Sequence, residues 1–206
     1  TLNAMPAVAA ILGSAFSESL PGELDLEPEP IDTEWGTQTL HRVSGTDRPA
    51  YVLFRHEVPH RLLPNQIDYR AQAAALRAVD CGALLVTSSV GVLDADVPLY
   101  RSLLVDDLIM LDNRLPDGTA CSMFTEPSDE HGHLVLNDGL FATELTEQVR
   151  DLAGKVRASV ADDVTFAYVQ GPRSKTAAEN RVWPRLGAQV NSMTLGPEVG
   201  LANELE

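Results

Sequence analysis

The fold is decided by the stretch Arg55-His56-Glu57-Val58-Pro59-His60, together with Val86-Thr87-Ser88-Ser89-Val90-Gly91 further along the chain. Each follows a short apolar run of the kind that forms a buried strand, and the segment 66–79 between them predicts one helix. Strand ends that carry a guanidinium, imidazoles and small hydroxyl side chains to one edge of a sheet form a pocket for an oxyanion. The sequence therefore predicts an anion site at a sheet edge.

Composition excludes several classes of protein. The chain has 206 residues, 44% of them hydrophobic, which is enough for a single domain over residues 1–206 with a full core and argues against global disorder. The formal net charge of −15 disfavours nonspecific binding to nucleic acid or to an anionic membrane. An anion must then be bound by local groups against an unfavourable overall field.

Cysteines, histidines and apolar runs bear on compartment and on metals. The two cysteines, Cys81 and Cys121, lack metal-ligand spacing and are expected to be reduced thiols of a cytoplasmic protein. No apolar run is long enough to span a bilayer, and the N-terminus does not resemble a secretory signal. The pair His131 and His133 could be a surface pair or a chance metal site, and without a Cys, Asp or Glu cluster beside it we expect no metal.

Strand and helix patterns alternate along the chain. They predict an α/β fold: a three-layer sandwich with a central twisted mixed β-sheet flanked by helices. Segments 18–37 and 112–137 are rich in turn residues and predict loops, the second long enough to be functional or mobile. The expected strands are 8–12, 39–43, 50–55, 84–87, 102–105, 164–169 and 190–194, and the expected helices are 66–79, 139–158, 177–183 and 197–205.

Five motifs in order resemble the trimeric purine nucleoside phosphorylase family, in particular its 5′-methylthioadenosine phosphorylase branch. They extend over nearly the whole chain, so the resemblance covers the fold as well as the site. The motifs are Ile11-Leu12-Gly13-Ser14, then Arg55-His56 with His60, Pro64 and Asp68-Tyr69-Arg70-Ala71, then Thr87-Ser88-Ser89-Val90-Gly91, then Gly171-Pro172-Arg173 with Ala178-Glu179, and finally Ser192-Met193-Thr194 with Pro197-Glu198-Val199.

The resemblance implies that inorganic phosphate cleaves the N-glycosidic bond of a purine nucleoside, giving the free base and ribose 1-phosphate. Phosphate is a co-substrate, no other cofactor is expected, and a 5′-modified nucleoside such as 5′-methylthioadenosine is the expected partner molecule. The transition state is oxocarbenium-like, so positioning and electrostatics can supply most of the catalysis without a protein nucleophile. The family's sites lie near subunit boundaries, which implies a homotrimer.

Site residues follow from the motifs by position. Arg55 and His56 are the expected catalytic residues, Met193 is expected to pack beneath the ribose, and His60 and His133 are expected at its 5′ end. Ser174 and Lys175 occupy positions that contact the base. The expected phosphate-binding residues are Ser14, Arg55, His56, Ser88, Ser89 and Thr194.

The chain departs from the family pattern at four places. Glu57 replaces a glycine after the Arg-His pair, and Pro98-Leu99-Tyr100 replaces a Pro-Gly-Asp turn. Lys175 replaces a glutamate of relatives that cleave guanine and hypoxanthine nucleosides, and Ser174 lacks the aromatic ring that stacks on the base. Family members continue past the final helix into a strand whose Asp or Asn assists the leaving base. Either the sequence is incomplete, which we expect, or the protein lacks activation of the leaving base, and a general-acid contribution of about 10²–10⁴-fold in rate would then be lost.

Two alternatives to a phosphorylase remain. A hydrolase of the related nucleosidase branch uses glutamates to activate water and does not need Arg55-His56, so the sequence argues against it. A catalytically inactive relative that binds a nucleoside, or acts as an oligomeric subunit, is motivated by Glu57, Lys175 and the absent C-terminal strand.

Overall fold

The computed structural model of the protein describes residues 5–16, 21–129, 131–137, 139–156, 158 and 160–205. These residues are built around two β-sheets. The first sheet has the order β2-β3-β4-β1-β5, in which β1 pairs in parallel with both β4 and β5. Strands β2, β3 and β4 pair antiparallel. Their bounds are Ala7–Leu12 for β1, Leu26–Thr33 for β2, Gly36–Val43 for β3, Ala50–Phe54 for β4 and Cys81–Val86 for β5.

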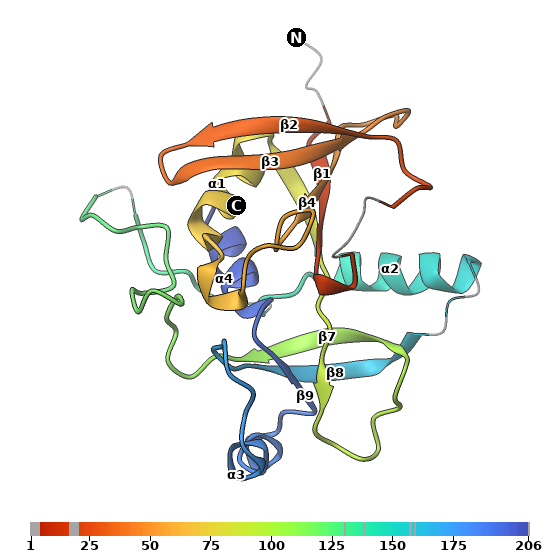
Figure 1. Ribbon diagram of the computed structural model, residues 1–206, viewed down its shortest axis with the longest axis vertical. Coiled ribbons are helices and arrows are strands. Elements are labelled where there is room, and N and C mark those ends of the chain that lie inside the picture. The colour runs from red at the N-terminus through yellow and green to blue at the C-terminus, as the bar shows by residue number, and fades with distance from the viewer. Residues whose placement is uncertain are drawn as a thin grey trace.

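The second sheet has the order β6-β9-β8-β7. Parallel pairing joins β7 to β8 and β8 to β9, whereas β6 runs antiparallel to β9. Figure 1 shows this sheet below the first one, with the long strands β7 and β8 side by side. The bounds are Gly91–Val92 for β6, Ser102–Ile109 for β7, Val160–Tyr168 for β8 and Val190–Ser192 for β9.

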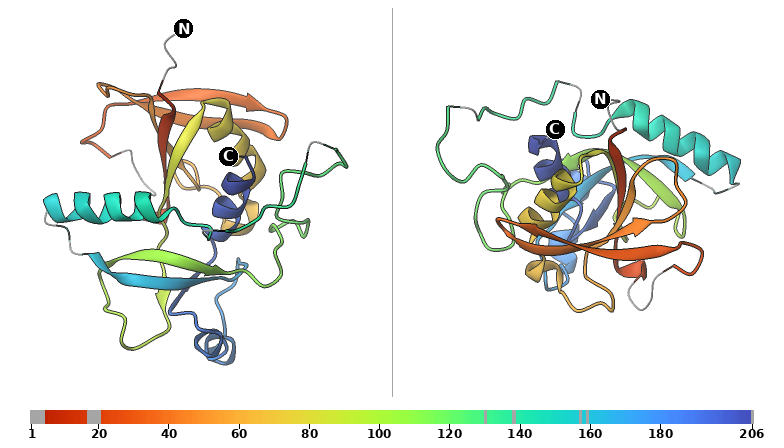
Figure 2. Two further views of the ribbon diagram at one scale, coloured as in Figure 1. Left: turned by 180° about the vertical axis from the view of Figure 1, so that it is seen from behind. Right: turned by 90° about the horizontal axis from the view of Figure 1, so that it is seen from above.

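In the described residues, four α-helices accompany the sheets. They are α1 (Tyr69–Ala78), α2 (Thr143–Lys155), α3 (Ala177–Asn180) and α4 (Gly196–Leu205), and short 3₁₀ turns span Ser14–Phe16, Pro64–Gln66 and Trp183–Leu186. Helices α1 and α4 lie side by side beneath β2 and β3, and α2 lies at the level between the two sheets (Figures 1 and 2). Helix α1 starts where the Asp68 carboxylate accepts a hydrogen bond from Ala71 N–H, as an N-cap residue does.

The hydrophobic core is divided between the two sheets and the α1–α4 pair. Ile11, Leu40, Leu53 and Ala75 form the cluster between the first sheet and α1, each at most 1% exposed. Phe166 and Val190, both fully buried, anchor the cluster on the second sheet. Buried alanines on α1 let the helix pack closely against its neighbours, which are the first sheet and α4.

The α/β class and mixed strand pairing are confirmed, although the strands form two hydrogen-bonded sheets instead of one. The expected strands and the α2 and α4 helices are confirmed with small changes at their ends. The loop expected over 18–37 is wrong, since β2 occupies Leu26–Thr33. Pro28 and Pro30 hid this strand, and both are tolerated because β2 lies at the sheet edge, where an N–H donor is not required.

Two helix expectations were too long. In the segment 66–79, Gln66 is the last residue of a 3₁₀ turn and α1 begins only at Tyr69. In 177–183, α3 ends at Asn180 and a second 3₁₀ turn begins at Trp183. The described part of 112–137 holds no helix or named strand and has one isolated bridge, between Arg114 and Ala120, so the long loop is confirmed.

Candidate functional site

The candidate site begins at the carboxyl ends of β1, β4 and β5. These neighbouring strands are parallel, so the residues that follow them meet at one edge of the sheet. Arg55 N–H donates to the Leu12 carbonyl (3.0 Å), and Thr87 N–H donates to the Ile11 carbonyl (3.0 Å). Backbone hydrogen bonding thus brings Gly13-Ser14, Arg55-His56 and Thr87-Ser88 together.

The Arg55 guanidinium lies at the centre of this edge and is almost wholly buried, at 1% exposure. Its Nε donates to Glu198 Oε1 (2.5 Å), and its Nη2 donates to Glu198 Oε2 (3.0 Å) and to the Thr87 carbonyl (2.7 Å). The remaining nitrogen, Nη1, lies so close to Gly13 that a Cβ on this glycine would stand 2.7 Å away. The glycine of the first motif is therefore required by close approach of the guanidinium.

Hydroxyl groups line the same edge. Ser88 Oγ and Thr194 Oγ1 are 2.9 Å apart, which joins the end of β5 to the turn after β9. Thr87 Oγ1 donates to the Ile11 carbonyl and accepts from Gly13 N–H, and this bonding holds the loop after β1. Ser14 is exposed beside Gly13, and the Ser89 carbonyl accepts a hydrogen bond from Ser88 Oγ.

His56 is buried next to Arg55 with a defined ring orientation. Its Nδ1 is 2.8 Å from the Leu62 carbonyl, so this nitrogen carries the proton and Nε2 carries the lone pair in the neutral ring. The ring stacks on that of His60, with centroids 4.4 Å apart. Burial lowers the pKa of His56 below its ordinary value of 6.5, and neighbouring Arg55 and His60 lower it further, against the opposing effect of the Leu62 hydrogen bond. The neutral imidazole is favoured.

Glu57 does not oppose an anion at this edge. Its backbone is left-handed, with a φ of 64°, and its carboxylate accepts a hydrogen bond from Arg61 Nε (2.6 Å) on the surface. A left-handed residue is most easily a glycine, which explains why the family pattern has glycine at this position. Glu57 in place of the family's glycine therefore changes a surface turn. The negative charge of Glu57 is paired with the Arg61 guanidinium.

The residues expected to hold the nucleoside are arranged more loosely. Met193 packs against Gly171, where a Cβ would stand 2.6 Å from the thioether sulfur, so the turn after β9 touches the loop after β8. Ser174 is exposed and Lys175 is half-buried, which lowers the pKa of the Lys175 ammonium against the opposing effect of Glu179. His60 is exposed, and its Nε2 lies 3.0 Å from the Leu62 carbonyl.

His133 lies apart from these residues. It lines a groove of about 640 Å³ formed by the 108–140 region and α4, and no other expected site residue lines that groove in the described part of the chain. Its neighbour His131 stacks on Phe124, with ring centroids 4.0 Å apart. Residues Ser14, Arg55, His56, Ser88 and Thr194 are called the strand-edge cluster below. Within one chain, His133 is therefore not brought to this cluster.

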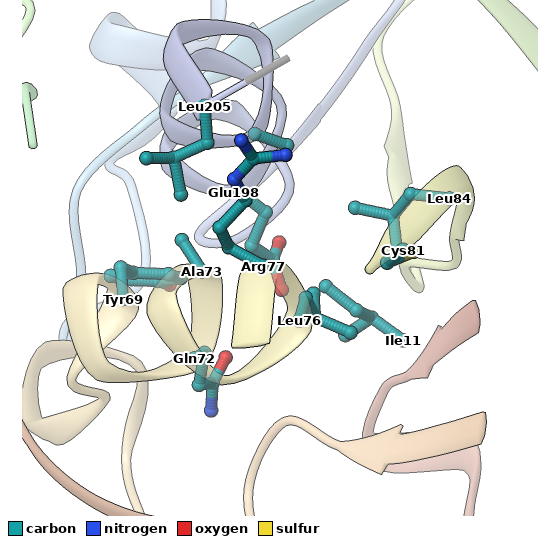
Figure 3. A pocket seen from close by; sticks show the side chains of 11 residues that line it. Ile11, Tyr69, Gln72, Ala73, Leu76, Arg77, Cys81, Leu84, Glu198 and Leu205 are labelled. Atoms are coloured by element: carbon teal, nitrogen blue, oxygen red, sulfur yellow. The ribbon is translucent and has the colours of Figure 1, made fainter. Parts of the chain in front are cut away.

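A second cavity, of about 50 Å³, lies between α1 and α4 (Figure 3). Its walls are mostly apolar, and Glu198 lines it from α4 while Tyr69 lines it from α1. A nucleoside needs several hundred Å³, so this space is a packing defect behind the site and not the nucleoside pocket.

Glu198 belongs to the candidate site, although its sequence motif indicated no role for it. It is 4% exposed, and its Oε2 accepts Leu195 N–H (2.6 Å) as well as Arg55 Nη2. Its contact with Leu195 could have been predicted from the sequence, because a glutamate at the third position of a helix commonly accepts a hydrogen bond from the N–H of the N-cap residue. Its pairing with a residue 143 positions away was not readable from the sequence.

The described residues hold neither a metal-binding cluster nor a membrane-spanning helix. No group of three or more His, Cys, Asp or Glu side chains is placed to hold a metal ion. None of the helices in the described ranges is both long and apolar enough to cross a membrane.

The fold and the strand-edge cluster define the class: an α/β protein of the nucleoside phosphorylase fold. A solved structure of methylthioadenosine phosphorylase from Schistosoma mansoni superimposes with a TM-score of 0.81 at 22% identity, over 96% of this chain and 75% of the other. The family described as "Phosphorylase superfamily" matches residues 8–206, and the chain belongs to this family.

Curated relatives fall in the same family. The chain is 31% identical to S-methyl-5′-thioadenosine phosphorylase of Thermofilum pendens, over 85% of this chain and 65% of the relative. It is 30% identical to a probable S-methyl-5′-thioinosine phosphorylase of Methanopyrus kandleri and 31% identical to a probable 6-oxopurine nucleoside phosphorylase of Thermococcus kodakarensis, in both cases over 98% of this chain and 75% of the relative. The chain thus spans about two thirds to three quarters of these relatives' lengths.

Proposed function

We propose that the protein catalyses phosphorolysis of a purine nucleoside, with a 5′-modified nucleoside such as 5′-methylthioadenosine as substrate. The observation that carries the proposal is the convergence of Gly13-Ser14, Arg55-His56, Ser88 and Thr194 on one strand edge. Relatives named as methylthioadenosine, methylthioinosine and 6-oxopurine nucleoside phosphorylases support it.

In this proposal the cluster binds inorganic phosphate. Arg55 Nη1 and the hydroxyls of Ser14, Ser88 and Thr194 donate hydrogen bonds to its oxygens, and Ser89 and His56 complete the site. Because Arg55 is already paired with Glu198, the binding energy comes mainly from directed hydrogen bonds and less from net positive charge. Such fixed donors are most effective where water is excluded, as at the buried Arg55.

The nucleoside lies over the phosphate, with Met193 beneath the ribose, His60 toward the 5′ group, and Ser174 and Lys175 near the base. A phosphate oxygen forms a bond to C1′ as the C1′–N bond breaks, and the electron pair leaves with the base, which takes up a proton. Phosphate held below the sugar stabilises the positive charge that develops there. Positioning of the two reactants is the protein's main contribution.

The protein is proposed to work as a cytoplasmic homotrimer. His133 would then complete the 5′ end of a neighbouring subunit's site, which accounts for its distance from the cluster in its own chain. Exposed apolar side chains next to it fit such an interface, since Leu134, Val135 and Leu136 are 40%, 67% and 50% exposed. Light scattering at micromolar concentration should give three times the chain mass, and a monomer would contradict the assembly.

Phosphate-dependent release of base is the direct test of the activity. Purified protein is incubated with 5′-methylthioadenosine, adenosine or inosine, with and without phosphate, and the base and the sugar phosphate are separated by chromatography. We expect base and sugar 1-phosphate in equal amounts, only with phosphate. Equal turnover without phosphate would indicate a hydrolase and contradict the proposal.

An inactive nucleoside binder is the second candidate, and one observation favours it: two of the three Arg55 nitrogens are already bonded within the protein. Calorimetry distinguishes the two. A binder would take up nucleoside without product over hours, and added phosphate would not tighten that binding.

A further inference from the structure

We infer that Glu198 is a positioning residue for phosphate, which aims Arg55 Nη1 into the anion site and fixes the turn that carries Thr194. This inference rests on the proposed function, and it assigns a role to a carboxylate that would ordinarily be unfavourable beside an anion site. The arrangement of its hydrogen bonds carries the inference.

The carboxylate binds two separate parts of the site at once. Oε1 accepts from Arg55 Nε (2.5 Å), and Oε2 accepts from Arg55 Nη2 (3.0 Å) and from Leu195 N–H (2.6 Å). Arg55 belongs to the loop after β4, and Leu195 belongs to the turn between β9 and α4. One buried side chain therefore sets the distance between the guanidinium and the Thr194 hydroxyl.

The geometry leaves a single donor face for a ligand. Arg55 Nε and Nη2 donate hydrogen bonds to Glu198 and to the Thr87 carbonyl, so Nη1 is the nitrogen that remains for a ligand. Nη1 lies beside Gly13, where there is no room for a Cβ. Because the guanidinium is planar, fixing two of its nitrogens fixes the direction of the third. Arg55 then contacts phosphate through one nitrogen.

The turn at Leu195 needs a partner of this kind. Leu195 has a φ of 75°, a left-handed conformation that is costly for a bulky side chain, and it is 4% exposed. The hydrogen bond from Leu195 N–H to Glu198 stabilises this conformation and so holds the adjacent Thr194 within reach of Ser88 Oγ, 2.9 Å away. Loss of the carboxylate should release both donors of the anion site together.

The test compares phosphate binding in Glu198→Gln, in Glu198→Asp and in the surface control Glu147→Gln. Glutamine removes the charge and keeps the length, whereas aspartate keeps the charge and withdraws it by one methylene. Glu147 lies on α2 and is paired with exposed Arg150. Phosphate affinity is measured by calorimetry, and the KM values for phosphate and nucleoside are measured separately, with melting temperatures recorded for every variant.

We expect both Glu198 variants to raise the KM and Kd for phosphate by about tenfold or more, since charge-assisted hydrogen bonds are lost or misdirected. The nucleoside KM should change less than threefold, and Glu147→Gln should match the parent protein. If Glu198→Gln does not fold, Glu198→Asp still tests the inference. An unchanged phosphate affinity in a folded Glu198 variant would overturn it.

A double-mutant cycle separates positioning from general stability. In an Arg55→Lys background the planar fork is gone and the Leu195 contact of Glu198 remains, so adding Glu198→Gln should lower phosphate affinity clearly less than it does in the parent protein. Full additivity of the two substitutions would overturn the inference, because Glu198 would then not act through Arg55.

The outcome also separates this inference from the proposed function. A parent protein that binds phosphate but releases no base would contradict the phosphorylase proposal, and calorimetry on the Glu198 variants would still decide the positioning role. If the protein is a phosphorylase and the Glu198 variants leave its KM for phosphate unchanged, only the positioning role is contradicted.

Discussion

The part of the candidate site proposed to bind phosphate (the phosphate side) and the part proposed to bind the nucleoside (the nucleoside side) are built in different ways. The phosphate side stands on adjacent parallel strands, a buried ion pair and main-chain hydrogen bonds. The nucleoside side depends on exposed Ser174, half-buried Lys175 and exposed His60, and on His133 in a separate groove. Under the proposed function, the common reactant, phosphate, would be held by the scaffold, and the variable reactant, the nucleoside, would be held by loops.

Removing the Arg55 charge should have the largest effect. Arg55→Met leaves Glu198 buried without its partner, and we expect a loss of about 3–5 kcal/mol in the free energy of unfolding. Chemical denaturation measures it. The double variant Arg55→Met/Glu198→Gln should recover part of the loss, and an equal loss in both proteins would show that the ion pair does not hold the phosphate side together.

Filling the space at Gly13 should have the next largest effect. In Gly13→Ala the new methyl would stand 2.7 Å from Arg55 Nη1, which cannot retreat because Glu198 and Thr87 hold the other nitrogens. We expect a loss of about 1–3 kcal/mol and weaker phosphate binding. The matched control is Gly154→Ala on α2, where nothing lies within 4 Å, and this variant should be stabilised by about 0.5–1 kcal/mol. Similar behaviour of both variants would contradict the close approach.

Acid should weaken the first sheet through two histidines, buried His56 after β4 and partly buried His41 on β3. Burial lowers the pKa of His56 and of His41 below the ordinary value of 6.5, so the unfolded chain takes up protons more readily than the folded protein. Their contribution to stability is then fully present above about pH 6.5 and is lost as the pH falls below it. Urea midpoints from pH 8 to pH 5 measure this loss.

The variant His41→Gln/His56→Gln should flatten that acid branch. Exposed His133→Gln is the control and should keep the slope of the parent protein. A parent protein that gains stability between pH 6.5 and pH 5 after correction for its carboxylates would contradict the assignment.

A change on the nucleoside side should affect stability least. Lys175→Glu alters a half-buried loop residue, and we expect less than about 0.5 kcal/mol change in unfolding free energy. Its effect should instead be on choice of base, with the ratio of inosine to 5′-methylthioadenosine turnover rising. Exposed Lys155→Glu at the end of α2 is the control. A large stability loss with no change in base preference would remove the distinction between the two sides.

Sequence patterns predicted most of the fold, because buried strands and helices show characteristic spacings of apolar residues. Val8 to Leu12 and Leu84 to Val86 are apolar runs, and each is a strand in the structure. The expected loop over 18–37 failed because two prolines in β2 outweighed its other features, and only the sheet shows that β2 is an edge strand. The motifs likewise indicated which residues surround an anion, whereas their pairing was not visible in them.

By itself the sequence determined the α/β class, the family and the candidate cluster, because residues that end parallel strands must meet at one sheet edge. Only the tertiary structure decided that Arg55 is shared with Glu198, that Glu57 turns outward to Arg61, and that His133 stands apart. These outcomes depend on side chains that are distant in the chain or on the direction of a turn. Local sequence sets which groups arrive at a site, and packing sets which of their atoms remain available to a ligand.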